Sequence, residues 1–109
     1  TDATLVNSVQ NAVTDNIESF YTSPTDGNGT RIEAFTASNN TDSNKTYKAY
    51  IYDAAGTALP AVMPLKIVVR NRFDVGAALV GQIIPAGGTL RMESNAALSI
   101  AYKVSGNEL

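Results

Sequence analysis

Apolar and polar residues alternate along several short stretches of the chain, with a period of two. Side chains on a β-strand point to opposite faces in turn, so this period predicts strands with one buried face. β-Branched and aromatic residues fill the stretches, as a half-buried pleated surface requires. The stretches, each with residues that share one face, are 30–37 (Ile32, Ala34 and Thr36), 45–53 (Tyr47, Ala49 and Ile51), 65–70 (Leu65, Ile67 and Val69) and 98–104 (Leu98, Ile100, Tyr102 and Val104). In the first stretch, the pattern assigns Phe35 to the face opposite Ile32.

Turn-forming residues separate these stretches at intervals of ten to fourteen residues from Tyr21 onward. Glycine supplies positive φ, proline fixes φ, and asparagine or aspartate bonds its own backbone, so each cluster predicts a turn. Short strands at such spacing are typical of a sandwich or barrel. The sequence therefore predicts an all-β fold, an antiparallel β-sandwich over residues 20–109. Within 73–84, Gly76 and Gly81 favour a strand with a bulge or kink.

Residues 1–19 have a different pattern and form a separate predicted segment. Apolar residues recur there every three or four positions, as on an amphipathic helix: Val6, Val9, Val13, Ile17 and Phe20. Valine, threonine, asparagine and isoleucine dominate the segment, however, and they are mediocre helix formers. Two alternatives therefore stay open, a short helix and an extended N-terminal arm.

Composition and charge limit the possible partners. The 109 residues have room for one core, and 44% of them are hydrophobic, as in a folded domain. The net charge is −2, without the excess of lysine and arginine that nucleic-acid binding normally needs. No apolar stretch is long enough to span a bilayer. We therefore expect neither a nucleic-acid partner nor a membrane partner.

The inventory of reactive side chains is small. The chain has no histidine and no cysteine, which removes the usual general base, the thiol nucleophile and the common metal ligands. The ten acidic residues are scattered singly, and several lie in or beside turns, where aspartate is expected anyway. The sequence therefore predicts no enzymatic activity, no catalytic residue, no cofactor and no metal.

Two tyrosines form the most suggestive pair. Tyr50 and Tyr52 share a face of their predicted strand, opposite its apolar face. Exposed tyrosines could stack on a sugar or pack on a neighbouring subunit. The alternative is that the sandwich buries one ring and a loop covers the other.

Several segments resemble small virion proteins of tailed bacteriophages. The segment 20–24, Phe-Tyr-Thr-Ser-Pro, leads through a glycine-rich turn into the strand 30–39, which ends in asparagine. The segment 83–90 and the ending 104–109 are similar to the closing half of the same proteins. The resemblance covers residues 20–109 in order, and 60–64 and 70–72 depart from it. It implies a jelly-roll-like β-sandwich that decorates or staples a capsid, or occurs in a tail.

From this resemblance we expect a decoration or cement protein on the capsid exterior, assembled in the cytoplasm of a bacterial host. Its partner would be the major capsid protein, whose neighbouring subunits it would join, and it would self-associate as a dimer or higher assembly. The alternative is a tail-associated module or a receptor- or carbohydrate-binding sandwich. The predicted contact residues are Leu5, Val6, Val9, Val13, Asn39, Asn40, Asp42, Asn44, Tyr50 and Tyr52.

Overall fold

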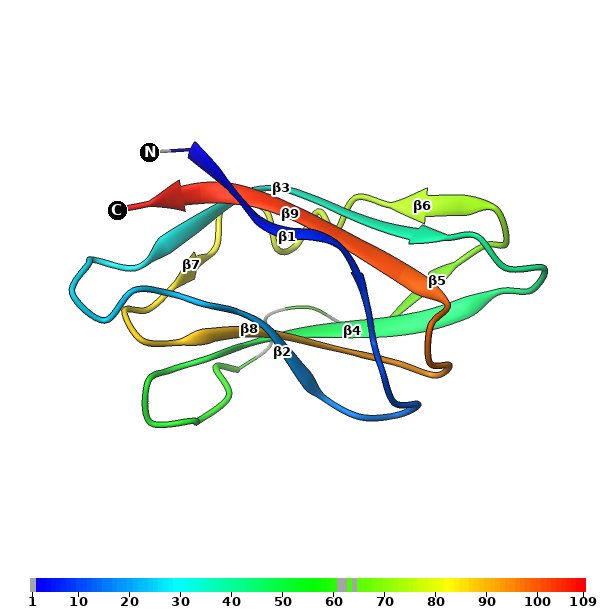
Figure 1. Ribbon diagram of the computed structural model, residues 1–109, viewed down its shortest axis with the longest axis horizontal. Coiled ribbons are helices and arrows are strands. Elements are labelled where there is room, and N and C mark those ends of the chain that lie inside the picture. The colour runs from blue at the N-terminus through cyan, green and yellow to red at the C-terminus, as the bar shows by residue number, and fades with distance from the viewer. Residues whose placement is uncertain (1, 61–62, 64) are drawn as a thin grey trace.

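The computed structural model describes residues 2–60, 63 and 65–109, which form two antiparallel β-sheets packed face to face (Figure 1). The prediction of an all-β sandwich is confirmed, and the described residues contain no helix. The first sheet has the order β1 (Asp2–Gln10), β9 (Ile100–Glu108), β3 (Thr30–Asn39) and β6 (Arg72–Asp74), with β7 (Ile83–Ile84) also paired to β3. The second has the order β2 (Glu18–Thr22), β8 (Thr89–Ser94), β4 (Lys45–Tyr52) and β5 (Lys66–Val68).

The chain crosses repeatedly between the sheets, at both ends of the sandwich. The β1–β2, β3–β4, β5–β6 and β8–β9 connections lie at one end in Figure 1, and the β2–β3 and β7–β8 connections and the turn that follows β4 lie at the other. β1 begins beside the end of β9, because Asp2 pairs with Asn107. β1 and β2 therefore form one long side of the sandwich, and β5 and β6 the other.

The helical alternative for the N-terminal segment is wrong. Residues 2–10 form β1, which pairs antiparallel with β9 as an edge strand of the first sheet. The register shifts between Thr4 and Val6 and again between Asn7 and Val9, where Ser8 has a positive φ of 56°. Bulges shift which positions of a strand face the core, so β1 does not keep a period of two. Val6 is buried, whereas Val9, Val13 and Ile17 are exposed, so the spacing of three or four does not mark one buried face.

Aromatic rings fill the centre of the sandwich. Tyr47 and Tyr102 are fully buried, with ring centroids 5.7 Å apart, and Phe35 stacks on Tyr47 at 5.8 Å. The alternation predicted for 45–53 is confirmed, since Tyr47, Ala49 and Ile51 all face the core. The assignment of Phe35 to the face opposite Ile32 is wrong. A bulge between Ile32 and Ala34 adds one residue to β3, so both side chains point inward.

Three other predicted segments differ from the simple pattern. Leu65, Ile67 and Val69 share a face as expected, but that face is exposed, and Val68 is the buried residue of β5. Leu98 lies outside the core, in the β8–β9 turn, with a positive φ of 54°. The stretch 73–84 is not one kinked strand, because β6 and β7 are separated by the turns of 75–82.

Candidate functional site

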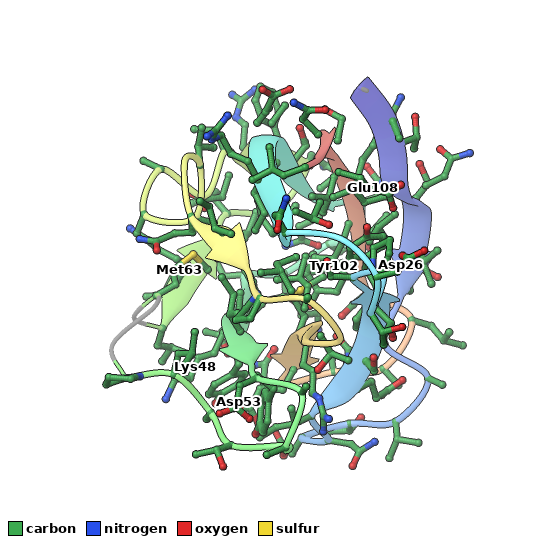
Figure 2. The ribbon with its side chains drawn as sticks, turned by 90° about the vertical axis from the view of Figure 1, so that its left-hand side faces the viewer. Asp26, Lys48, Asp53, Met63, Tyr102 and Glu108 are labelled. Atoms are coloured by element: carbon green, nitrogen blue, oxygen red, sulfur yellow. The ribbon has the colours of Figure 1, made fainter. Side chains whose placement is uncertain are left out.

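The outward face of β4 and β8 carries a cluster of aromatic and charged side chains. Because Tyr47, Ala49 and Ile51 point inward, the alternate residues of β4 point outward. In the register of the pair, Lys48 lies opposite Glu93, Tyr50 opposite Arg91 and Tyr52 opposite Thr89. Figure 2 shows the contrast between Lys48 at the surface and Tyr102 between the sheets. We call Lys48, Tyr50, Tyr52, Arg91 and Glu93 the tyrosine cluster.

Contacts within the tyrosine cluster fix the orientation of both rings. The Tyr50 hydroxyl donates to the Glu93 carboxylate, and the Lys48 ammonium lies 5.6 Å from the Tyr50 ring centroid. The Arg91 guanidinium stacks 4.1 Å from the Tyr52 ring centroid, a cation–π distance. The two rings meet edge to face, with their centroids 6.3 Å apart.

The protonation state of Tyr50 is also fixed. Burial and the neighbouring Glu93 carboxylate raise the pKa of Tyr50 to about 12, because both disfavour the phenolate. Tyr50 is therefore a neutral hydrogen-bond donor throughout the physiological pH range.

A shallow pocket of about 170 Å³ adjoins the tyrosine cluster. Its lining residues are Asp15, Thr46, Tyr47, Lys48, Leu65, Glu93, Ser94 and Asn95. The β1–β2 loop reaches the pocket because the Asp15 N–H donates to the Ser94 carbonyl at 2.9 Å. Asn95 is held by its Oδ1, which accepts from the Thr46 N–H at 2.9 Å. Lys48 and Glu93 belong to both the pocket and the cluster, so the two form one continuous surface.

A second candidate surface runs along the β5–β6 side of the sandwich. Large apolar side chains there are more than half exposed: Leu65 (56%), Ile67 (65%), Val69 (51%), Phe73 (64%) and Val75 (55%). We call these residues the apolar edge. Lys66, Arg70 and Arg72 alternate with them along the chain. The carboxylate of Asp74, the acidic residue of β6, is used within the protein instead. Its Oδ2 accepts from the Tyr47 hydroxyl at 2.7 Å and from the Gly76 N–H at 3.0 Å.

The backbone of β5 is also open on this side. Thr46 directs its N–H and C=O to Asn95, toward β8, so its neighbours Lys45 and Tyr47 direct theirs to β5. These neighbours pair with Val68 and Lys66. The N–H and C=O of Ile67 therefore face away from β4, at the free edge of the sheet.

The structure separates the predicted contact residues into surface and interior positions. Val6 and Asn39 are buried, and their prediction as surface contacts is wrong. Asn39 has a structural role, since its amide group donates to the Ser43 and Val68 carbonyls at 2.9 Å each. Leu5 packs partly buried against the core. The remaining predicted contacts are exposed (Val9, Val13, Asn40, Asp42 and Asn44) or half-buried on the outer face of β4 (Tyr50 and Tyr52).

Sequence reasoning missed the partners of the two tyrosines and the apolar edge. Arg91 and Glu93 lie on β8, where their alternation with the apolar Leu90 and Met92 was a signal for a strand, but their approach to β4 depends on strand pairing. The apolar edge did have a signal, namely the alternation in 65–70. That pattern identified residues that share a face and left open whether the face is turned to the core or to solvent.

Neither the side-chain chemistry nor the comparisons assign a known activity. Among the described residues, no group of three or more acidic side chains lies close enough to hold a metal ion. No helix in the described part of the chain is long and apolar enough to cross a membrane. Comparisons with models of known protein families, with curated proteins and with solved structures returned no match. The resemblance to bacteriophage virion proteins therefore rests on the sequence signatures alone.

Proposed function

We propose that this protein is a structural component of a virus particle, a decoration or cement protein on the capsid exterior. It binds across neighbouring major capsid protein subunits and stabilises the shell. The observation that carries the proposal is the apolar edge, where Leu65 and Ile67 at β5 and Phe73 on β6 are each more than half exposed. Several large, exposed apolar side chains on two neighbouring edge strands are typical of a site that another protein covers.

The strand order supports the same proposal. The sheets β1-β9-β3-β6 and β2-β8-β4-β5, with the chain crossing between them, support the proposal of a jelly-roll-like sandwich. Jelly rolls are common in viral capsid proteins and in lectins. The order therefore favours the same two functions that the sequence raised, capsid decoration and carbohydrate binding.

The size of the apolar edge sets the strength of one contact. Fully burying a large apolar side chain stabilises a complex by roughly 1.5–3 kcal/mol, so a half-exposed one contributes roughly 1 kcal/mol. The five side chains of the apolar edge then give about 5 kcal/mol in total. That is near the lower limit of the estimated cost of association, about 4–15 kcal/mol. One copy would bind weakly, and self-association into a dimer or higher assembly would give tight binding through avidity.

The charge of the edge favours a capsid partner over a second copy at this surface. Lys66, Arg70 and Arg72 flank the apolar residues, so two apolar edges placed together would bring like charges into contact. A capsid surface with acidic groups around an apolar patch would complement both features. We therefore place any self-association at another part of the sandwich.

The test is reconstitution on particles that lack the protein. Wild-type protein is added back, its copies per major capsid protein are counted by quantitative mass spectrometry, and the disruption temperature is measured. We expect copies on the order of hundreds, in fixed ratio to the shell subunit, and a higher disruption temperature. A handful of copies would indicate a tail module instead, and no bound copies would overturn the virion assignment.

A matched pair of variants ties the result to the apolar edge. Ile67→Glu places a charge in its centre at a position that is 65% exposed. Leu98→Glu makes the same change at a position that is 67% exposed in the β8–β9 turn. Both variants should fold, and only Ile67→Glu should fail to bind to the particle. Equal incorporation of the two variants would refute the role of the apolar edge.

A further inference from the structure

The pocket beside the tyrosine cluster has the chemistry of a site for hydroxyl groups. Asp15 and Glu93 bring carboxylates that accept from hydroxyls, and Lys48 brings an ammonium that donates to their oxygens. Asn95 adds an amide, whose NH₂ group remains a donor while its oxygen accepts from a backbone N–H. Leu65 provides an apolar wall. Donors, acceptors and an apolar surface in one pocket match a sugar ring, which presents hydroxyls at its rim and C–H groups on its face.

The volume of the pocket limits what enters it. Pockets for drug-sized ligands measure roughly 300–1,000 Å³, and this one measures about 170 Å³. It has room for a single ring, so a longer ligand must extend over the neighbouring surface. That surface is the tyrosine cluster, because Lys48 and Glu93 border both.

The tyrosine cluster is suited to receive the next part of such a ligand. The Tyr50 ring is held by its hydrogen bond to Glu93 and by its edge-to-face contact with Tyr52. The Arg91 guanidinium lies 4.1 Å from the Tyr52 ring centroid, closer than the 5.6 Å between the Lys48 ammonium and the Tyr50 ring centroid, so Tyr50 is the better stacking surface. Because these contacts already restrict both rings in the free protein, a ligand loses less conformational entropy when it stacks there.

From this juxtaposition we infer that the outer face of the β2-β8-β4-β5 sheet binds a neutral saccharide, with one ring in the pocket and the next against Tyr50. The charge of the pocket selects the class of sugar. Over the pocket and the tyrosine cluster together, the carboxylates of Asp15 and Glu93 are balanced by the cations of Lys48 and Arg91, so the site has no net charge and an acidic sugar gains no net attraction there. This binding activity goes beyond capsid attachment, although Leu65 belongs to both surfaces.

The test titrates the isotope-labelled full chain with soluble oligosaccharides and follows its backbone amide resonances. The neutral probes are maltotriose, lactose and the trimer of N-acetylglucosamine, and sialyllactose is the acidic probe. We expect saturable shifts with at least one neutral probe, confined to β4, β8 and the pocket residues, with a Kd near roughly 1 mM. No shifts with any neutral probe, shifts elsewhere on the sandwich, or stronger binding of sialyllactose would each overturn the inference.

Variants distinguish stacking from general surface binding. Tyr50→Ala should weaken binding at least tenfold, whereas Tyr50→Phe keeps the ring and should weaken it less. Phe73→Ala removes an aromatic ring that is 64% exposed on β6, outside the cluster, and should leave the affinity unchanged. If Tyr50→Ala does not fold, Lys48→Ala tests the pocket without removing a ring. Unchanged affinity in the folded variants of Tyr50 and Lys48 would refute the site.

Discussion

Asn11 joins the two sheets through a buried side chain, and its replacement should be costly. The residue is 1% exposed, at the end of β1. Its Nδ2 donates to the Met92 carbonyl of β8 at 2.9 Å, and its Oδ1 accepts from the Tyr102 hydroxyl of β9 at 2.8 Å. One amide group therefore satisfies polar atoms from both sheets.

The substitution Asn11→Leu keeps a similar volume and removes these two hydrogen bonds, together with longer ones from Nδ2 to the Asn16 carbonyl at 3.4 Å and to Glu18 Oε2 at 3.3 Å. Each buried polar group left without a partner costs about 1–3 kcal/mol, so we expect a loss of roughly 2–4 kcal/mol. A domain of this size is stable by about 5–15 kcal/mol. The corresponding fall in Tm is roughly 10–20 °C. Tyr102→Phe alone should destabilise the protein less, because it leaves only the Asn11 oxygen without its donor.

The double variant gives the sharper test. In the wild-type chain Tyr102→Phe breaks a hydrogen bond, but in the Asn11→Leu chain it removes a hydroxyl that has already lost its acceptor. The same substitution should therefore destabilise the first background and stabilise the second, by about 1 kcal/mol or more. Urea unfolding followed by far-UV circular dichroism measures all four chains, with the exposed Asn40→Leu as control. Additive free energies in the double variant would refute the proposed network.

Three further outcomes follow from buried tyrosines and backbone geometry. Burial raises the pKa of Tyr47 and Tyr102 well above the ordinary value of 10 and that of Tyr50 to about 12. As pH rises, these phenols lose their protons in the unfolded chain before they do so in the folded protein. The free energy of unfolding should therefore be unaffected below about pH 10 and fall above it. Absorbance of tyrosinate should rise cooperatively with unfolding. Gly106→Ala should lower stability by about 1–3 kcal/mol in urea, because its Cβ would overlap a backbone carbonyl of β3. Leu98→Asn should raise Tm by relieving roughly 1 kcal/mol of positive-φ strain, since asparagine tolerates that conformation.

The sequence predicted the class of fold because turns and alternation are local signals. β4 shows why: its strand is regular, so the period of two places Tyr47, Ala49 and Ile51 in the core without further information. β3 and β1 show the limit. A bulge brings Phe35 inward, and two bulges in β1 break the period of two that would have identified a strand there. Bulges depend on the partner strand, so single-sequence periodicity does not locate them.

The candidate saccharide site was predicted only in part for a related reason. The shared face of Tyr50 and Tyr52 follows from alternation within one strand. Arg91 and Glu93 join them through the register of β4 with β8, and Asp15 approaches through a backbone hydrogen bond from the β1–β2 loop. These contacts depend on tertiary pairing between distant segments, which neither spacing nor composition encodes.

At the apolar edge, the sequence pattern and the structure disagree: alternation in 65–70 predicts a buried apolar face, and the structure exposes that face. Alternation of large apolar residues is typical of a strand with one face out of water, and β4 has its apolar face in the core. In β5, Val68 fills the core position, so the face of Ile67 is exposed in the single chain. The two observations agree if a partner covers that face, and they conflict if the chain works alone. A folded Ile67→Glu variant decides between them. If the variant no longer binds the particle, a capsid partner covers this face. If it still binds, a partner at this face does not explain the alternation in 65–70.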